Sequence, residues 1–289
     1  MRRSAISLGL AALVLLIWPA IALAATDPLL NTAGNFAVLS GAGMTNTGPS
    51  WITGAIGASN AGITGFPPGT AGPKHIGDSA FTTAETDLVG TYTRAQAEPT
   101  TTDYSNVNLG GLTLGPGVYN QSTAPTLTGT LTLSGGGVYI FKIGSTLVTA
   151  SGARVSLING AQPCDIFWAV ASSATIATST TFVGNIMAVA SIQMQTGATL
   201  NGRALAQTAA VTLDTNRIIQ PSGCVGGFTQ SFPVPAYVAP PTGNILPATL
   251  GVPWELINEI PWLLVIAVGA GLGATVLVVS NRRRRRRQA

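Results

Sequence analysis

The side chains best suited to chemistry in this sequence are hydroxyl groups that return at a fixed interval. Three blocks begin at Thr178, Thr196 and Asp214, each 18 residues after the one before. A hydroxyl donates and accepts hydrogen bonds, so a regular column of hydroxyls can bind water or a neutral hydroxylated surface. Each such bond contributes little because it replaces a bond to water. Binding of this kind therefore needs many groups held in a rigid array.

A fixed repeat that contains a short strand predicts a β-solenoid, in which every coil stacks on the next around a continuous core. Strands of adjacent coils lie about 4.8 Å apart, so equivalent residues form columns along the outside. Alternation along each strand predicts an inward set and two outer columns. The inward set is Val155, Phe182, Leu200 and Ile218; one outer column is Arg154, Thr181, Thr199 and Arg217; the other is Gly152, Ser179, Gly197 and Thr215.

One segment outside the repeat has helical periodicity. Apolar residues recur at spacings of three and four over residues 79–98, which predicts a long helix with one apolar face. Asp78 or Ser79 is suited to cap it, and Pro99 ends it. We expect this helix to lie against the solenoid and cover one side.

The residue types that most enzymes and metal sites require are scarce. His75 is the only histidine, which excludes a His-based catalytic triad and a histidine cluster for a metal. No phosphate-binding loop or dinucleotide fingerprint is present, and the acidic residues are scattered. The sequence therefore predicts a protein that is not an enzyme, with no catalytic residue, metal or cofactor. We expect His75 to be a satisfied surface or capping residue.

The charge of the chain resides mainly at its two ends. The net charge is +4 with only 8 % charged residues, but residues 26–240 contain six basic and eight acidic residues. A basic surface for phosphate contacts is therefore missing from the middle, which argues against a nucleic-acid partner. Threonine, serine, asparagine and glycine must cover most of the domain surface.

The N-terminus has the pattern of a secretory signal peptide. Residues 1–24 contain two arginines, an apolar run, a proline and a small-x-small cleavage site at Ala22-Leu23-Ala24. A retained N-terminal membrane helix is the alternative. We expect residues 26–225 to form the exported domain.

The C-terminus has the pattern of a membrane anchor. Residues 226–260 are proline-rich and predict a semi-rigid stalk. Residues 261–280 are long and apolar enough for a transmembrane helix. The arginine-rich tail, residues 281–289, predicts a cytoplasmic C-terminus by the positive-inside rule. We therefore expect a single-pass cell-membrane protein with its domain outside the cytoplasm.

Two further features of this region have alternative readings. Gly269 and Gly273 have a spacing that permits close helix packing and thus a homodimer, although small residues are common in such helices. Leu246–Leu250 resembles a cell-wall sorting signal, but Leu250 stands where that motif has glycine, which favours a simple membrane anchor.

Cys164 and Cys224 are the only cysteines, and both fall in the predicted exported part. An even number in an oxidising compartment predicts a disulfide, with two buried thiols as the alternative. The bond would fasten the end of the domain to an interior strand.

Several segments resemble the microbial ice-binding protein family of secreted antifreeze and ice-adhesion proteins. They are Leu30–Ser40, Ile52–Gly57, Pro116–Tyr119, Pro163–Trp168 and Asn201–Thr208, in that order over about residues 28–222. The resemblance implies an all-β fold: a discontinuous, right-handed, triangular β-solenoid with one long flanking helix.

The resemblance also implies that a flat solenoid face binds ice, often through Thr-Ala/Gly-x-Thr/Asn strands. Residues 196–199 match that pattern, and residues 178–181 match it with serine at the second place. The candidate ice-binding residues that the resemblance implies are Thr178, Ser179, Thr181, Thr196, Gly197, Thr199 and Thr215. Residues 151–154 and 214–217 depart from it, with arginine at the last place. A charged, mobile side chain there would disturb a lattice-like water layer.

These observations predict a membrane-anchored cell-surface protein that adsorbs to ice through a Thr/Ser-rich face. Antifreeze activity, inhibition of recrystallisation and ice adhesion all fit that expectation. The alternative is a surface adhesin that binds a neutral glycan or another surface without affinity for ice. Threonine is also a good strand former on any solvated face, and a polysaccharide-cleaving enzyme is a more distant alternative.

Overall fold

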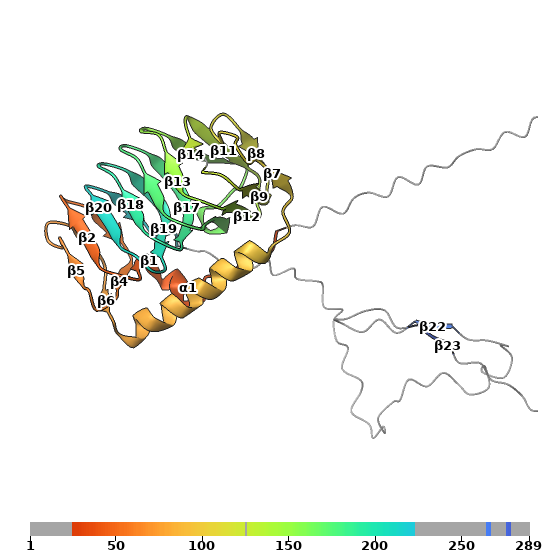
Figure 1. Cartoon of the computed structure of the whole chain (residues 1–289), viewed down its shortest axis with the longest axis horizontal. Helices are drawn as coiled ribbons and strands as arrows, with labels where there is room; N and C mark the ends of the chain where they lie inside the picture. The colour runs from red at the N-terminus through yellow and green to blue at the C-terminus, as the bar shows by residue number, and fades with distance from the viewer. Residues whose placement is uncertain (1–24, 125, 223–263, 267–275, 279–289) are drawn as a thin grey trace, which may run out of the picture. The chain divides into compact units, whose positions relative to one another are not determined.

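The computed structural model describes residues 25–124, 126–222, 264–266 and 276–278 (Figure 1). The chain divides into two compact units, Met1–Thr229 and Gln230–Ala289. The first unit is a stack of coils whose strands form three faces along one axis (Figure 1). The predicted β-solenoid is thus confirmed for the described part of this unit.

The first face is a separate sheet of seven parallel strands, here called the seven-stranded sheet. Its strands, in spatial order, are β10 (Thr126–Leu127), β13 (Leu147–Thr149), β16 (Ala174–Ile176), β18 (Ile192–Met194), β20 (Val211–Asp214), β2 (Met44–Thr47) and β5 (Ile63–Thr64).

The second face, here called the arginine-bearing face, is also built from parallel strands. Its strands, in spatial order, are β8 (Thr113–Leu114), β11 (Thr130–Ser134), β14 (Arg154–Ile158), the first halves of β17 (Thr181–Ala188) and β19 (Thr199–Ala206), β21 (Arg217–Ile219) and β3 (Trp51–Thr53).

The third face contacts the helix. Its strands, in spatial order, are β7 (Thr102–Asp103), β9 (Gly117–Gln121), β12 (Tyr139–Ile143), β15 (Ile166–Val170), the second halves of β17 and β19, β1 (Phe36–Ser40), β4 (Ala55–Ala58) and β6 (Lys74–Ile76). Two short 3₁₀ helices, η1 (Asn31–Asn35) and η2 (Pro163–Asp165), precede β1 and β15.

The N-terminal and C-terminal coils meet inside the stack, nearer to the end that contains β5 and β6. β1 pairs with β19, and β2 pairs with β20, so strands from opposite ends of the domain are neighbours. The discontinuous solenoid implied by the family resemblance is therefore present.

The interior follows the predicted alternation. Val155, Phe182, Leu200 and Ile218 are all at most 3 % exposed. Aromatic rings from successive coils stack along the axis, with ring centroids of Phe141 and Trp168 4.0 Å apart. Burial of this continuous apolar column is the main stabilising contribution to the stack.

The predicted helix is α1 (Ser79–Ala97), which runs along the solenoid (Figure 1). Asp78 caps it by accepting a hydrogen bond from the Phe81 amide at 2.9 Å. Phe81, Ala84 and Leu88 are buried against the third face, as the apolar periodicity predicts. Thr91 is fully buried as well, and its hydroxyl is satisfied there because it donates a hydrogen bond to the carbonyl of Leu29.

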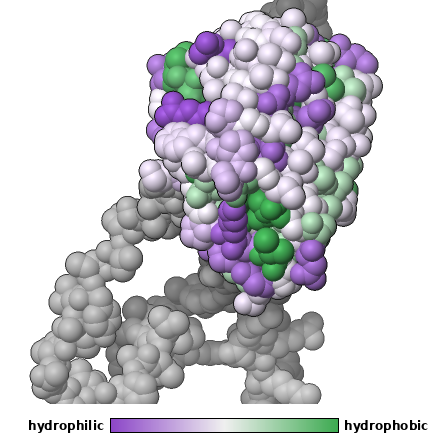
Figure 2. Space-filling model, turned by 90° about the vertical axis from the view of Figure 1, so that its left-hand side faces the viewer, coloured by the Kyte–Doolittle hydropathy of each residue, from purple (hydrophilic) through white to green (hydrophobic). Residues whose placement is uncertain are grey.

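The surface of the stack is weakly polar, as the low charge content indicates. The end of the solenoid that contains β5 and β6 shows pale and hydrophilic residues with a few separate hydrophobic clusters (Figure 2). Such a surface depends on hydroxyl and amide groups for its solvation.

Several predicted segments lie outside the described residues. They are the signal peptide (1–24), the stalk (226–260) with Leu246–Leu250, the glycines 269 and 273, the cytoplasmic tail (281–289) and Cys224. No described helix is long and apolar enough to cross a membrane. The disulfide, the anchor and the export signal stay predictions.

Within the predicted transmembrane helix, two segments are described, and both are strands. β22 (Leu264–Ile266) pairs antiparallel with β23 (Val276–Val278). The prediction of helix is wrong for these two segments in this structure. Both are rich in β-branched residues, which favour strands.

Candidate functional site

The seven-stranded sheet presents one continuous outer row of uncharged side chains. Strand register places one residue of each strand in this row. In spatial order the row is Thr126, Val148, Thr175, Gln193, Thr212, Thr45 and Thr64. We call it the threonine row.

Alternation along each strand exposes this row and buries its flanks. In β20, Thr212 is exposed between the buried Val211 and Leu213. The same pattern holds in β18, where Gln193 is exposed between buried neighbours. The inward side chains pack in the core, so the backbone carrying the outer row is held rigidly.

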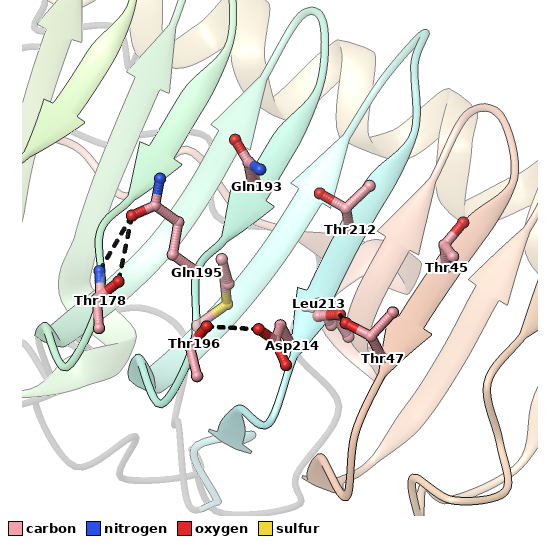
Figure 3. A pocket seen from close by; sticks show the side chains of 10 residues that line it. Thr45, Thr47, Thr178, Gln193, Gln195, Thr196, Thr212, Leu213 and Asp214 are labelled. Atoms are coloured by element: carbon pink, nitrogen blue, oxygen red, sulfur yellow. Dashed lines mark hydrogen bonds between the residues drawn. The ribbon is translucent and has the colours of Figure 1, made fainter.

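A shallow groove of about 460 Å³ lies beside the centre of the row (Figure 3). Its floor is formed by β18, β20 and β2, and Thr45, Gln193 and Thr212 line it. Thr178 and Thr196, two of the predicted site residues, lie at its lower edge (Figure 3).

The hydroxyls at this edge are held by neighbours on adjacent coils. Thr178 donates to the side-chain oxygen of Gln195 from its hydroxyl at 3.4 Å and from its amide at 3.2 Å. Thr196 donates from its hydroxyl to the carboxylate of Asp214. Fixed donors leave the hydroxyl lone pairs in defined directions, which is the property that ordered water requires.

Asp214 is the one acidic residue that lines the groove. Hydrogen bonds from the hydroxyls of Thr196 and Thr215 lower the pKa of this carboxyl from its ordinary value. Asp214 is therefore ionised at neutral pH, at the edge of the groove and outside the threonine row.

The predicted outer column of Arg154, Thr181, Thr199 and Arg217 is confirmed by strand register. It belongs to the arginine-bearing face and not to the seven-stranded sheet. Thr178 and Thr196 lie instead in the turns at the corner between these two faces.

The second predicted column consists of turn residues at that corner. Gly152, Ser179, Gly197 and Thr215 all have positive φ, between 52° and 71°. Repetition of a left-handed conformation explains why glycine alternates there with small polar residues. Two of the seven predicted site residues thus begin strands of the arginine-bearing face, and the other five lie in the corner turns; the corner residues are Thr178, Ser179, Thr196, Gly197 and Thr215.

The threonine row was missed because its members do not repeat at a single spacing. Thr45 and Thr64 come from the N-terminal coils, and Val148 and Gln193 interrupt the run of threonines. A usable signal was the triplet of an apolar, a polar and an apolar residue in β16, β18 and β20, centred on Thr175, Gln193 and Thr212.

His75 is a satisfied surface residue, the first of the two roles that we expected, and the helix cap is Asp78. The Nδ1 atom of His75 lies 2.8 Å from the Asp78 carboxylate, which caps α1. The hydrogen bond from the Phe81 amide, with a further contribution from His75, lowers the pKa of Asp78. Among the described residues, no group of three or more metal-ligating side chains is placed to hold a metal.

Stacked coils, one covering helix and a rigid, uncharged outer row define a β-solenoid with one exposed neutral sheet face. The sequence profile of the family described as Ice-binding-like matches residues 38–219. The chain therefore belongs to this family.

Similar proteins and structures carry the same description. An ice-binding protein of Nostoc sp. (strain HG1) is 44 % identical over 68 % of this chain and 75 % of its own length. One of Flavobacterium frigoris (strain PS1) is 37 % identical over 66 % of this chain and 76 % of its own length. The crystal structure of an ice-binding protein from Antarctomyces psychrotrophicus has a TM-score of 0.66 and 40 % identity, covering 68 % of this chain and 99 % of its own.

Proposed function

We propose that this protein binds ice, and that the binding surface is the threonine row together with the edge residues Thr178 and Thr196. The family and its ice-binding relatives support the ligand. The observation that supports this face is the absence of charge from all seven residues of the row.

Physical reasoning favours this face over the arginine-bearing face. Hydroxyls hydrogen-bond surface water, and the threonine methyl groups restrict its freedom. Adjacent strands fix the spacing of the groups at about 4.8 Å, so many weak contacts form together without a large ordering cost. On the arginine-bearing face, Arg154 and Arg217 interrupt the equivalent row.

Thermal hysteresis and partitioning into a growing ice front test the proposal directly. The purified full chain is compared with a non-binding protein of similar size. We expect a clear enrichment in ice and a measurable gap between melting and freezing points. Values equal to those of the control protein would contradict the proposal and leave the alternative of a surface adhesin without ice affinity.

We also propose that the domain is exported and anchored in the cell membrane, with the C-terminus in the cytoplasm. The signal pattern in residues 1–24, the apolar run in 261–280 and the arginines that follow it support this topology. Membrane anchoring would hold the cell against ice or protect the nearby envelope. Protease added to intact cells should remove the domain and leave a tag at the C-terminus uncut; a cut C-terminal tag would refute this orientation.

A further inference from the structure

The six basic side chains of the described domain fall into two groups. Four of them donate to backbone carbonyls: Lys74 to Phe66, Arg94 to Pro28 and Leu29, Lys142 to Glu98, and Arg203 to Gly34. These four cations stabilise the fold by satisfying backbone carbonyls. Arg203 is the most buried, and burial lowers its pKa to about 10.

Arg154 and Arg217 form the second group. Both are exposed, and within the part of the chain that the structure describes, neither side chain donates a hydrogen bond to protein or pairs with a carboxylate. Both lie in one outer row of the arginine-bearing face. The two cations of the described domain that have neither a hydrogen-bond acceptor nor a carboxylate partner therefore share one row of one face.

Stacking orients one of these guanidinium groups. The Arg217 guanidinium carbon lies 4.8 Å from the centroid of the Trp51 ring, which belongs to the next strand in register. Trp51 is itself 45 % exposed. A stacked guanidinium uses its flat face and leaves the N–H groups at its edge for a planar anion such as a carboxylate.

The surroundings of the two arginines are neutral and rich in hydrogen-bonding groups. Thr181 and Thr199 lie between them in the row, and Asn201 is exposed in the next position of β19. The strands of this face contain no acidic residue. Three strand steps separate the arginines, a distance of about 14 Å at the usual strand spacing.

We propose that the arginine-bearing face binds an acidic polysaccharide laid along the solenoid axis. The two guanidinium groups would bind carboxylates of separate sugar units. The protein hydroxyl and amide groups between the arginines would form hydrogen bonds with sugar hydroxyls. This surface differs from the threonine row and goes beyond the proposed ice binding.

The sparse charge favours this class of ligand over other polyanions. Nucleic acid complexes gain most of their affinity from several phosphate contacts, and anionic membranes attract clusters of four to eight basic residues. Two cations about 14 Å apart among neutral polar groups fit a polymer with widely spaced carboxylates and many hydroxyls. Contact at both arginines at once raises affinity beyond that of a single site.

The test measures retention of the full chain in native gels that contain alginate, a uronate polymer, with neutral dextran as the matched control. Arg154→Thr and Arg217→Thr are conservative for the fold because threonine fills the two places between them. We expect alginate to retard the wild type and dextran not to. The double variant should bind alginate at least about tenfold more weakly, with a smaller loss in each single variant.

Further measurements distinguish binding of an acidic polysaccharide from ice binding and from binding of other polyanions. Thr212→Tyr, on the threonine row, should leave alginate binding unchanged even where ice binding is lost. Equal alginate binding by the wild type and the double variant would overturn the proposal, as would equal retention by dextran. Stronger binding to anionic phospholipid vesicles or to duplex DNA than to alginate would also overturn it.

Discussion

Thr45 and Thr212 are direct register partners on neighbouring strands, although they come from opposite ends of the domain. Their pairing joins the N-terminal and C-terminal halves of the threonine row. The uncharged surface is therefore a product of the discontinuous fold, and neither half contains it alone.

Replacing Thr212 with tyrosine tests the role of this row. The ring would project from the centre of the exposed row and prevent close approach of a flat ice surface. We expect thermal hysteresis to fall by at least about tenfold while the melting temperature stays within a few degrees, because exposed substitutions change stability little.

Thr199→Tyr is the matched control on the arginine-bearing face. Thr199 is half-buried at the start of β19, and the substitution should leave most ice adsorption intact. Loss of adsorption in Thr199→Tyr with retention in Thr212→Tyr would move the ice-binding site to the other face.

Gly202 lies at the corner between the second and third faces, and we predict that a side chain at this position lowers the stability of the domain strongly. A Cβ atom there would lie only 1.9 Å from the carbonyl oxygen of Gly184, its register partner. Gly202→Ala should lower the free energy of unfolding by about 3 kcal/mol, measured by denaturant unfolding.

Gly152→Ser is its control. Nothing lies within 4 Å of a Cβ atom at Gly152, and Ser179 occupies the equivalent turn position with φ of 56°. The loss should stay below about 1 kcal/mol. Similar losses in both variants would show that close packing at the corner is not the cause.

Acid should destabilise the domain below about pH 3.8. Four carboxyls accept hydrogen bonds that lower their pKa from the ordinary value of 3.8: Asp78, Asp87, Asp103 and Asp214. A depressed folded-state pKa contributes stability above the unfolded value, and this contribution is lost as the pH falls through the folded-state pKa.

Two carboxyls act in the opposite direction. Burial raises the pKa of Glu85 and Asp165, so their protonation relieves a cost of folding. We expect the melting temperature to be level above about pH 5 and to fall below pH 3.8. Asp78→Asn keeps a capping oxygen without titrating, so it should make that fall shallower. An unchanged acid profile would contradict the role of Asp78.

The predicted bond between Cys164 and Cys224 has a measurable consequence. Closing a loop of roughly 60 residues would stabilise the domain by about 4 kcal/mol in the chain-entropy model. We expect no titratable thiol in the unreduced, denatured chain and a loss of that size in Cys164→Ser. Two titratable thiols would favour the alternative of unpaired cysteines.

The local repeat predicted much of the fold. Residues 178–218 alternate regularly, so the inward set and the column through Thr181 and Thr199 followed from spacing alone. The apolar periodicity similarly predicted α1 and its cap. These features depend on contacts between consecutive coils, and residues one repeat apart in the sequence make those contacts.

The threonine row depends on contacts that the repeat does not record. Its strands have two to four residues, too few for a clear alternation, and the intervals between Thr126, Val148 and Thr175 are unequal. The position of Thr45 depends on long-range pairing of β2 with β20. Only the folded arrangement brings these residues into one line.

The pairing of β1 and β2 with β19 and β20 also determines the order in which the domain can be completed. Strands β1 to β6 are synthesised first, yet the sheet edges that receive β19 and β20 stay unpaired until nearly the whole domain has been made. Such high contact order slows folding and leaves strand edges open to wrong partners. The last coils to be synthesised therefore fill an interior position of the stack, and a nascent chain that stops before residue 199 lacks β19, β20 and β21, the three strands that pair with its N-terminal coils.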